Sequence, residues 1–294
     1  MGLSKLSVLL PPVNASNFNA QTISYSPMNA EFLGFMANLV YQKDEASIKK
    51  VLADDNRLKN FDYKHLQFID HKPSDTQALV VADDEKVVVS FRGTSQSRDW
   101  LTNLDYKLVQ PDDLFGKVHS GFHEAFHYVW QTVKETLKSY KGKGGTYKSI
   151  WITGHSLGGA LACLATSHLV QEDYPVYGLY TFGQPRVGDR AFARILNSEF
   201  KDRYFIFVNH QDIVTRIPTR EMGYSHAGNI LYFDAEGNLS KDLHSWFKFQ
   251  DELNGKFEVL KSWITGNLFG DHSMENSYLP LLQKHNNHNP FLRF

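Results

Sequence analysis

Hydrophobic residues recur with a helical period near the start of the chain. Apolar positions between residues 32 and 40 follow the spacing i, i+3, i+4, i+7 and i+8, which predicts an amphipathic helix beginning at Pro27. A second short helix is expected at 45–52. Residues 1–26 are rich in Asn, Ser and Pro and predict an irregular N-terminal arm.

Short apolar runs follow these helices and predict strands. The first three are expected at 65–69, 76–81 and 86–91. Residues 82–85, three of which are acidic, separate the second run from the third, which predicts a hairpin. A long helix is expected at 121–140, and the Lys- and Gly-rich residues 141–145 mark its end.

From residue 149 onward, strand and helix patterns alternate. The expected strands are 149–153, 176–182, 204–208 and 229–234, and the expected helices are 158–170, 189–199 and a stretch within 246–263. Such alternation is typical of an α/β fold with a mostly parallel central sheet and helices on both faces. The hairpin predicts antiparallel strands at one edge. With no repeat or linker, residues 1–294 are expected to form a single domain.

Composition narrows the functional classes. The chain has 294 residues, 42% of them hydrophobic, and a formal net charge of −1, which does not favour nucleic-acid binding. Cys163 is the single cysteine, so no intrachain disulfide can form, and a buried apolar role is expected for it. The i,i+4 pair His119 and His123 lacks the Glu of a zincin motif, so we interpret it as surface helix polarity and predict no metal site.

Targeting signals are weak. No apolar stretch approaches ~18 residues, so no transmembrane helix is expected. The apolar run within residues 1–12 is too short for a signal peptide. We therefore expect a cytoplasmic protein, or one exported without a recognisable signal, or a secreted one if a leader was removed.

The segment Gly154-His155-Ser156-Leu157-Gly158 joins a predicted strand to a predicted helix. Gly-x-Ser-x-Gly in this setting is typical of a nucleophile elbow, in which a strained turn exposes the serine hydroxyl. Glycines at both ends remove Cβ atoms that would collide in the turn. The helix that follows directs its N-terminal N–H groups at the reaction centre. Ser156 is therefore the candidate nucleophile.

A serine nucleophile needs an acid-supported base. Asp212 follows the strand at 204–208, and sites form at the carboxyl ends of parallel strands, so Asp212 is the preferred acid. The rival, Asp189, precedes a helix and is more simply explained as its N-cap.

Physical arguments leave the base open among the histidines beyond Asp212. His272 lies between two helical stretches, His226 precedes a strand, and His285 and His288 lie in a polar tail. The candidates are His226, His244, His272, His285 and His288.

Backbone donors are required to stabilise the oxyanion. The N–H of Leu157 directly follows the nucleophile. A second donor is expected after an earlier strand, where Thr94 follows Phe91-Arg92-Gly93 and offers both an N–H and a hydroxyl.

Together these segments resemble the class 3, or fungal-type, lipases of the α/β-hydrolase fold. The motifs that carry the resemblance are Phe91-Arg92-Gly93-Thr94, Val118-His119-Ser120-Gly121-Phe122, Gly154-His155-Ser156-Leu157-Gly158-Gly159-Ala160, Thr181-Phe182-Gly183-Gln184-Pro185-Arg186-Val187-Gly188, Asn209-His210-Gln211-Asp212-Ile213-Val214 and Asp271-His272-Ser273. They occur in the family's order over roughly residues 30–285. Unlike secreted fungal members, this chain cannot form disulfides.

The resemblance implies a role for each matching residue. Ser156 becomes the nucleophile, Asp212 the acid and His272 the base, while Thr94 and Leu157 match the oxyanion positions. It also implies a short lid at about 95–106. Trp100 and Leu101 are its candidate lipid-facing residues, and ordinary packing of a short helix is the alternative.

The implied activity is hydrolysis of lipid esters, of the triacylglycerol lipase type, through an acyl-enzyme at a lipid–water interface and without a cofactor or metal. Phospholipase A1, monoacylglycerol lipase and feruloyl esterase activities use the same chemistry and remain alternatives. A non-catalytic, lipase-like regulatory module is the rival of a different class. Such modules typically lose part of the triad or oxyanion loop, and this chain retains every expected position.

Overall fold

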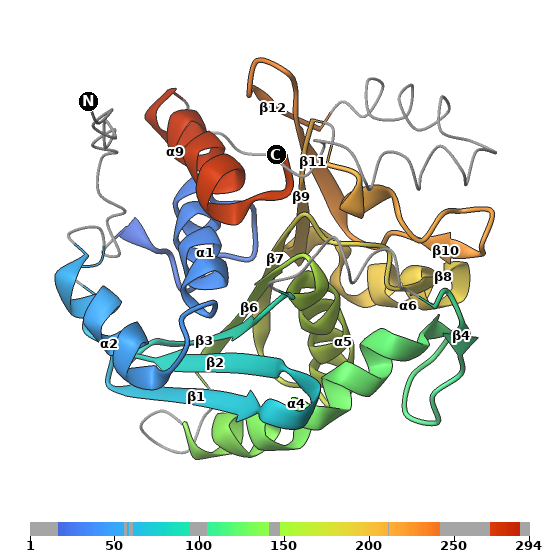
Figure 1. Ribbon diagram of the computed structural model, residues 1–294, viewed down its shortest axis with the longest axis horizontal. Helices are drawn as coiled ribbons and strands as arrows, with labels where there is room; N and C mark the ends of the chain where they lie inside the picture. Colours follow the sequence, from blue (N-terminus) through green and yellow to red (C-terminus); the bar gives the residue numbers. More distant parts are fainter. Residues whose placement is uncertain are drawn as a thin grey trace, which may run out of the picture.

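A large central sheet organises the molecule (Figure 1). The computed structural model describes residues 17–55, 58, 61–94, 105–140, 148–210, 212–241 and 271–288. Eight strands lie in the order β1-β2-β3-β6-β7-β9-β11-β12. Their bounds are β1 His65–His71, β2 Thr76–Ala82, β3 Lys86–Phe91, β6 Ser149–His155, β7 Val176–Phe182, β9 Tyr204–Asn209, β11 Asn229–Phe233 and β12 Leu239–Ser240.

Strand direction follows the sequence pattern. The predicted hairpin is confirmed, because β2 and β3 pair antiparallel with Val80 opposite Val89. Strand β1 adds a further antiparallel strand at that edge. From β3 through β6, β7 and β9 to β11 every pair is parallel. The antiparallel strand β12 at the opposite edge was not predicted, since two residues carry no periodic signal.

Helices cover both faces of the sheet, as predicted. On one face lie α1 (Pro27–Leu39), α2 (Glu45–Asp54) and α9 (Leu279–His288), with α1 and α9 side by side (Figure 1). On the other face lie α4 (Ser120–Ser139), α5 (Leu157–Gln171) and α6 (Arg190–Phe200). Each face buries its own apolar core against the sheet. The architecture is the α/β-hydrolase class that the sequence predicts.

Local chemistry explains where helices begin. Ser26 caps α1 by accepting the Asn29 N–H at 3.2 Å, and Pro27 takes the first helical position, where its missing N–H costs nothing. Asp189 caps α6 by accepting the Phe192 N–H at 2.8 Å, which confirms the interpretation of Asp189 as an N-cap. The helical stretch predicted within 246–263 lies outside the described residues.

The end of the N-terminal arm is irregular but packed. Residues 18–25 form no helix or strand. Phe18 is nevertheless buried, with its ring 4.9 Å from that of Trp151 in an edge-on arrangement, and Tyr25 is buried beside Phe205. This part of the arm therefore closes the core over one face of the sheet.

A second, small sheet was not predicted. Four two-residue strands pair antiparallel in the order β10-β8-β5-β4, with bounds β4 Leu108–Val109, β5 Val118–His119, β8 Gly188–Asp189 and β10 Tyr224–Ser225. Strands this short fall below the length at which alternation can be recognised.

The interpretation of His119 as a surface residue is wrong. Its side chain is buried, and its Nδ1 accepts the N–H groups of Gly121 and Phe122, so that it caps α4. Burial lowers the pKa of His119 to about 4, and the imidazole stays neutral. His123 instead contacts His127 on the outer side of α4. No group of three or more His, Cys, Asp or Glu suited to a metal ion occurs within the described ranges.

Two further observations concern the helices: the position of the single cysteine and the capacity to span a membrane. Cys163 is buried in α5, as predicted, and burial raises the pKa of its thiol to about 12. None of the helices in the described part of the chain combines the length and apolar character needed to cross a membrane.

Candidate active site

The turn between β6 and α5 holds Ser156 in a strained conformation. Its φ and ψ are 58° and −130°, a region that non-glycine residues rarely adopt. A Cβ on Gly158 would lie 2.1 Å from the Phe91 carbonyl oxygen, and one on Gly154 would lie 2.3 Å from the Gly158 oxygen. Both glycines are therefore required by close packing, as predicted. The turn therefore has the backbone geometry expected of a nucleophile elbow.

The N-terminus of α5 and the exit of β3 meet at Ser156. Leu157 is the first residue of α5, so its N–H has no acceptor within the helix. A Cβ on Gly93 would lie 3.2 Å from the Ser156 Cβ, which places the loop that carries Thr94 directly beside the serine. The two predicted oxyanion residues therefore flank Ser156.

Asp212 and His272 form a buried pair. Asp212 follows β9, and His272 lies just before the π-helical turn Met274–Tyr278. The His272 Nδ1 donates to Asp212 Oδ2 at 2.9 Å, and the exposed fractions of the two residues are 3% and 0%. The sequence separation is 60 residues, so the fold alone brings this pair together.

Two more donors hold the Asp212 carboxylate. The Tyr278 hydroxyl donates to Oδ2 at 2.6 Å, and the Val214 N–H donates to Oδ1 at 2.9 Å. Burial by itself would raise the pKa of Asp212, but the charge and hydrogen bond of His272 and the hydrogen bond of Tyr278 outweigh it, and the pKa lies below its usual value. The carboxylate is therefore ionised and oriented.

A second histidine packs on the other side. His155 directly precedes Ser156, and its ring centroid lies 4.5 Å from that of His272. Its Nε2 bonds to the His272 carbonyl oxygen at 2.6 Å, and its Nδ1 bonds to the Tyr41 hydroxyl at 3.0 Å. A carbonyl only accepts, so Nε2 carries the proton and Tyr41 donates to Nδ1.

His155 is kept neutral by its surroundings. Burial, followed by the neighbouring His272, lowers the pKa of His155 to about 3. The Tyr41 oxygen also accepts the Gly93 N–H, and burial raises the pKa of Tyr41 so that its hydroxyl keeps its proton. Gly93, Tyr41, His155 and the backbone of His272 are thus joined in one chain of hydrogen bonds.

The structure places most of the predicted residues around Ser156. Asp212 and His272 are hydrogen-bonded to each other, and His272 is joined to Ser156 through its neighbour His155. Ser156 is fully buried, and its Oγ has no hydrogen-bond partner within the described part of the chain. The candidate lid residues Trp100 and Leu101 lie outside the described residues.

The other histidines that the sequence left open as the base are not paired with Asp212 where the structure describes them. His226 Nε2 bonds to the Thr215 carbonyl oxygen at 2.7 Å, a structural contact. His285 was assigned to a polar tail, which is wrong, because it is buried in α9 where that helix packs against α1. His244 lies outside the described residues, and so does the side chain of His288.

Sequence reasoning missed three residues of the site. They are Tyr41, His155 and Tyr278. His155 lies inside the recognised motif, where its position beside the nucleophile was a usable signal. Tyr41 follows α1, and Tyr278 ends the π-helical turn after His272, so neither carries a local pattern that indicates its contact.

Comparisons with known proteins agree with this geometry. The family model for Lipase (class 3) matches residues 88–222. The chain is 36% identical over 168 residues to secreted mono- and diacylglycerol lipase 1 of Fusarium solani. This match covers 56% of this chain and 49% of that protein. The chain spans about half the length of the curated relatives it matches.

Solved structures share the fold. The triacylglyceride lipase of Rhizomucor miehei superposes with a TM-score of 0.61 at 30% identity, covering 71% of this chain and 80% of that one. A further solved structure is of a triacylglycerol lipase whose catalytic centre is formed by a serine protease triad. It superposes with a TM-score of 0.61 at 27% identity, and the match covers 81% of this chain and 94% of that one. The elbow, the buried Asp–His pair and these similarities establish that the chain belongs to the class 3 lipase family.

Proposed function

We propose that this protein is a serine hydrolase that cleaves lipid esters of the triacylglycerol type. The observation that carries the proposal is the buried Asp212–His272 pair, packed against the residue that precedes the strained Ser156. The names of the relatives as triacylglycerol or mono- and diacylglycerol lipases support this substrate class. A single α/β-hydrolase domain carries the whole site.

In the acylation step, Ser156 Oγ attacks the ester carbonyl carbon while His272 Nε2 takes the hydroxyl proton. Asp212 holds the tautomer with a proton on Nδ1 and stabilises the imidazolium that forms. The N–H groups of Leu157 and Thr94 stabilise the negative oxygen of the tetrahedral intermediate. Collapse of this intermediate expels the alkoxide, which receives the proton from His272, and an acyl-enzyme remains.

Deacylation repeats the same steps with water as the nucleophile. His272 removes a proton from water, the hydroxide attacks the acyl carbon, and Ser156 leaves with that proton as the fatty acid is released. Because Ser156 is fully buried, the ester reaches Oγ only after covering atoms move.

His155 and Tyr41 act as positioning residues in this scheme. The neutral His155 ring supports the His272 backbone through its carbonyl, and Tyr41 connects that support to Gly93, next to the oxyanion residue Thr94. The base and the oxyanion loop are thereby held at a fixed separation.

Relatives of the chain are named as secreted, which supports action outside the cell. The experiment that tests the function is hydrolysis of p-nitrophenyl esters from short to long acyl chains, with Ser156→Ala and His272→Ala beside the wild type. Turnover that persists on long chains and disappears in both variants supports a lipase. Activity confined to short chains contradicts the lipid substrate, and full activity in either variant contradicts the triad.

A further inference from the structure

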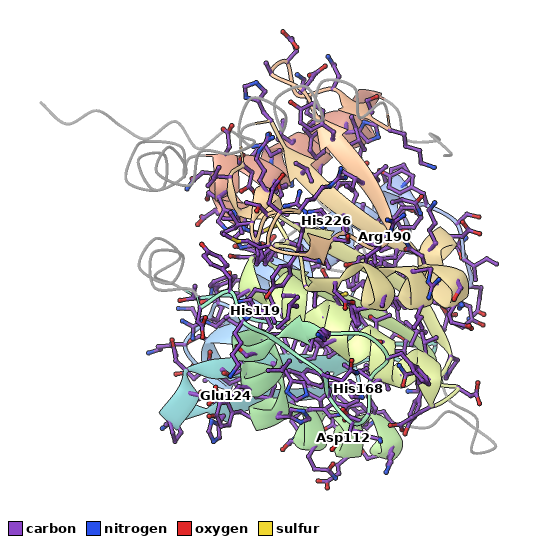
Figure 2. The ribbon with its side chains drawn as sticks, turned by 90° about the vertical axis from the view of Figure 1, so that its right-hand side faces the viewer. Asp112, His119, Glu124, His168, Arg190 and His226 are labelled. Atoms are coloured by element: carbon purple, nitrogen blue, oxygen red, sulfur yellow. The ribbon has the colours of Figure 1, made fainter. Side chains whose placement is uncertain are left out.

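A basic pocket lies apart from the candidate active site. It has a volume of about 720 Å³ and lies where α6, β10 and β11 meet. Four positively charged side chains line it, and no Asp or Glu occurs among its described lining residues. The four are Arg190, Lys201, Arg220 and Lys241. Figure 2 shows Arg190 close to His226, which lines the same pocket.

The four cations come from separate segments. Arg190 begins α6, Lys201 begins the short turn Lys201–Arg203 that follows it, and Lys241 follows β12. Arg220 lies in the loop before β10. Since the whole chain has a net charge of −1, this concentration of positive charge is local and produced by the fold.

The charged groups around the pocket influence one another. Partial burial lowers the pKa of Lys241, the charge of Asp202 opposes this shift, and the smaller effect of Lys201 adds to it. The positive charge of Arg220 is one of the influences that lower the pKa of Glu221. Neither acid lines the pocket. An anion inside it would therefore meet a positive potential.

The pocket wall is held by hydrogen bonds. The Asn229 side-chain amide donates to the Lys201 carbonyl at 2.6 Å, and the Gly228 N–H donates to the Asn197 side chain at 2.6 Å. Tyr224 and Ile230 supply less polar surface. These bonds fix the backbone of the pocket wall at Lys201 and Gly228, which reduces the entropy lost on binding.

We propose that this pocket binds a phosphate ester, with the phosphate held by the arginines and lysines. Arginine presents a planar fork that matches phosphate oxygens, and lysine adds point charge. A volume of about 720 Å³ lies within the roughly 300–1,000 Å³ range of small-molecule sites, so the phosphate belongs to a larger organic molecule. The chemistry fits both a phospholipid headgroup at a surface and a soluble phosphate monoester.

The pocket adjoins the loop of Asp212 without sharing its residues. His226 Nε2 bonds to the Thr215 carbonyl, and the Thr215 hydroxyl donates to the Asp212 carbonyl at 2.9 Å. A headgroup bound here would place a lipid surface next to the loop that carries the triad acid. None of the proposed catalytic or oxyanion residues lines the pocket.

Two matched arginines on α6 test the proposal. Both arginines are exposed, but Arg190 lines the pocket whereas Arg194, one turn later on the same helix, does not. Arg190→Gln and Arg194→Gln remove the same charge. Both are made in the full chain with Ser156→Ala, so that no lipid ester is consumed and the result does not depend on the proposed hydrolysis. Thermal unfolding checks the fold, and Arg220→Gln replaces Arg190→Gln if the latter fails to fold.

Binding is measured with glycerol 3-phosphate by calorimetry, and with phosphatidylcholine vesicles with and without phosphatidylglycerol by sedimentation. We expect Arg190→Gln to weaken binding about tenfold and Arg194→Gln to change it by less than about twofold. Binding of glycerol 3-phosphate supports a soluble phosphate ester, and binding of the anionic vesicles alone supports a headgroup. The proposal is overturned if neither probe binds, or if the two substitutions weaken binding equally.

Discussion

Two histidines pack against each other in the candidate active site, and they differ in the groups to which they are hydrogen-bonded. His272 is hydrogen-bonded to the Asp212 carboxylate, whereas His155 is bonded only to neutral groups, the Tyr41 hydroxyl and a backbone carbonyl. Both imidazoles are buried. A buried imidazole can carry a proton during turnover only where a nearby carboxylate stabilises the charge, and His272 has such a partner in Asp212. The comparison assigns base chemistry to the His272 region and positioning to the His155 region.

Removing the carboxylate should have the largest effect. Asp212→Asn keeps the shape of the side chain but withdraws the charge that stabilises the His272 imidazolium and fixes its tautomer. We expect kcat to fall by about 10⁴-fold with the fold retained. Hydrolysis of a short p-nitrophenyl ester measures the loss, and a circular dichroism spectrum controls for folding. A loss below about tenfold would remove the distinction between the two regions.

Removing the second imidazole should cost less. His155→Gln withdraws the ring that supports the His272 backbone but leaves the Asp212–His272 pair intact. A displacement of the base by about 1 Å is expected to lower kcat by about 100-fold. The same ester assay applies, with KM recorded separately. A loss as large as that of Asp212→Asn, with KM unchanged, would show that His155 takes part in the chemistry.

Acid should destabilise the protein through His155. Its pKa is about 3 in the folded state, below the ordinary value of about 6.5, so the unfolded chain binds the proton first as the pH falls. Stability is therefore lost between about pH 6.5 and pH 3. From pH 7 to pH 5 this group should lower the free energy of unfolding by about 2 kcal/mol.

Urea unfolding at the two pH values measures this loss. His155→Gln should reduce the difference between pH 7 and pH 5, while buried His119 and His226 continue to contribute in the same direction. An unchanged difference in the variant would indicate that His155 is already charged in the folded protein.

Removing one hydroxyl should have the smallest effect. Tyr41→Phe keeps the ring but leaves the Gly93 N–H and His155 Nδ1 without their shared partner. We expect a loss of activity of about three- to tenfold, consistent with one hydrogen bond at a positioning site. Tyr128→Phe, on the exposed side of α4, is the matched control. Equal activities of the two variants would exclude a role for the Tyr41 link.

One strand and three site residues show what could be predicted from the sequence alone. The strand at 176–182 was predicted with its observed bounds, because a β-branched and aromatic run between turn residues admits one interpretation. Ser156 and Asp212 were found from their positions at strand ends. His272 needed the family resemblance, because its pairing with Asp212 depends on a contact across 60 residues.

Other features had no local signal. Tyr41 contacts His155 across 114 positions in the chain, so neither propensity nor spacing indicates it. His119 was misinterpreted because an i,i+4 pair of polar residues suits an exposed helix face, whereas this histidine precedes the helix and caps it. The basic pocket combines four segments, each of which is an ordinary surface sequence on its own.

The central claim is that Ser156 is a nucleophile activated by the Asp212–His272 pair. The most direct test is covalent labelling with a fluorophosphonate, with the adduct located by peptide mass spectrometry in wild type, Asp212→Asn and His155→Gln. We predict one adduct, on Ser156, formed fastest in the wild type, more slowly in His155→Gln and slowest in Asp212→Asn. An adduct on another residue, or equal labelling rates in the three proteins, would contradict the account.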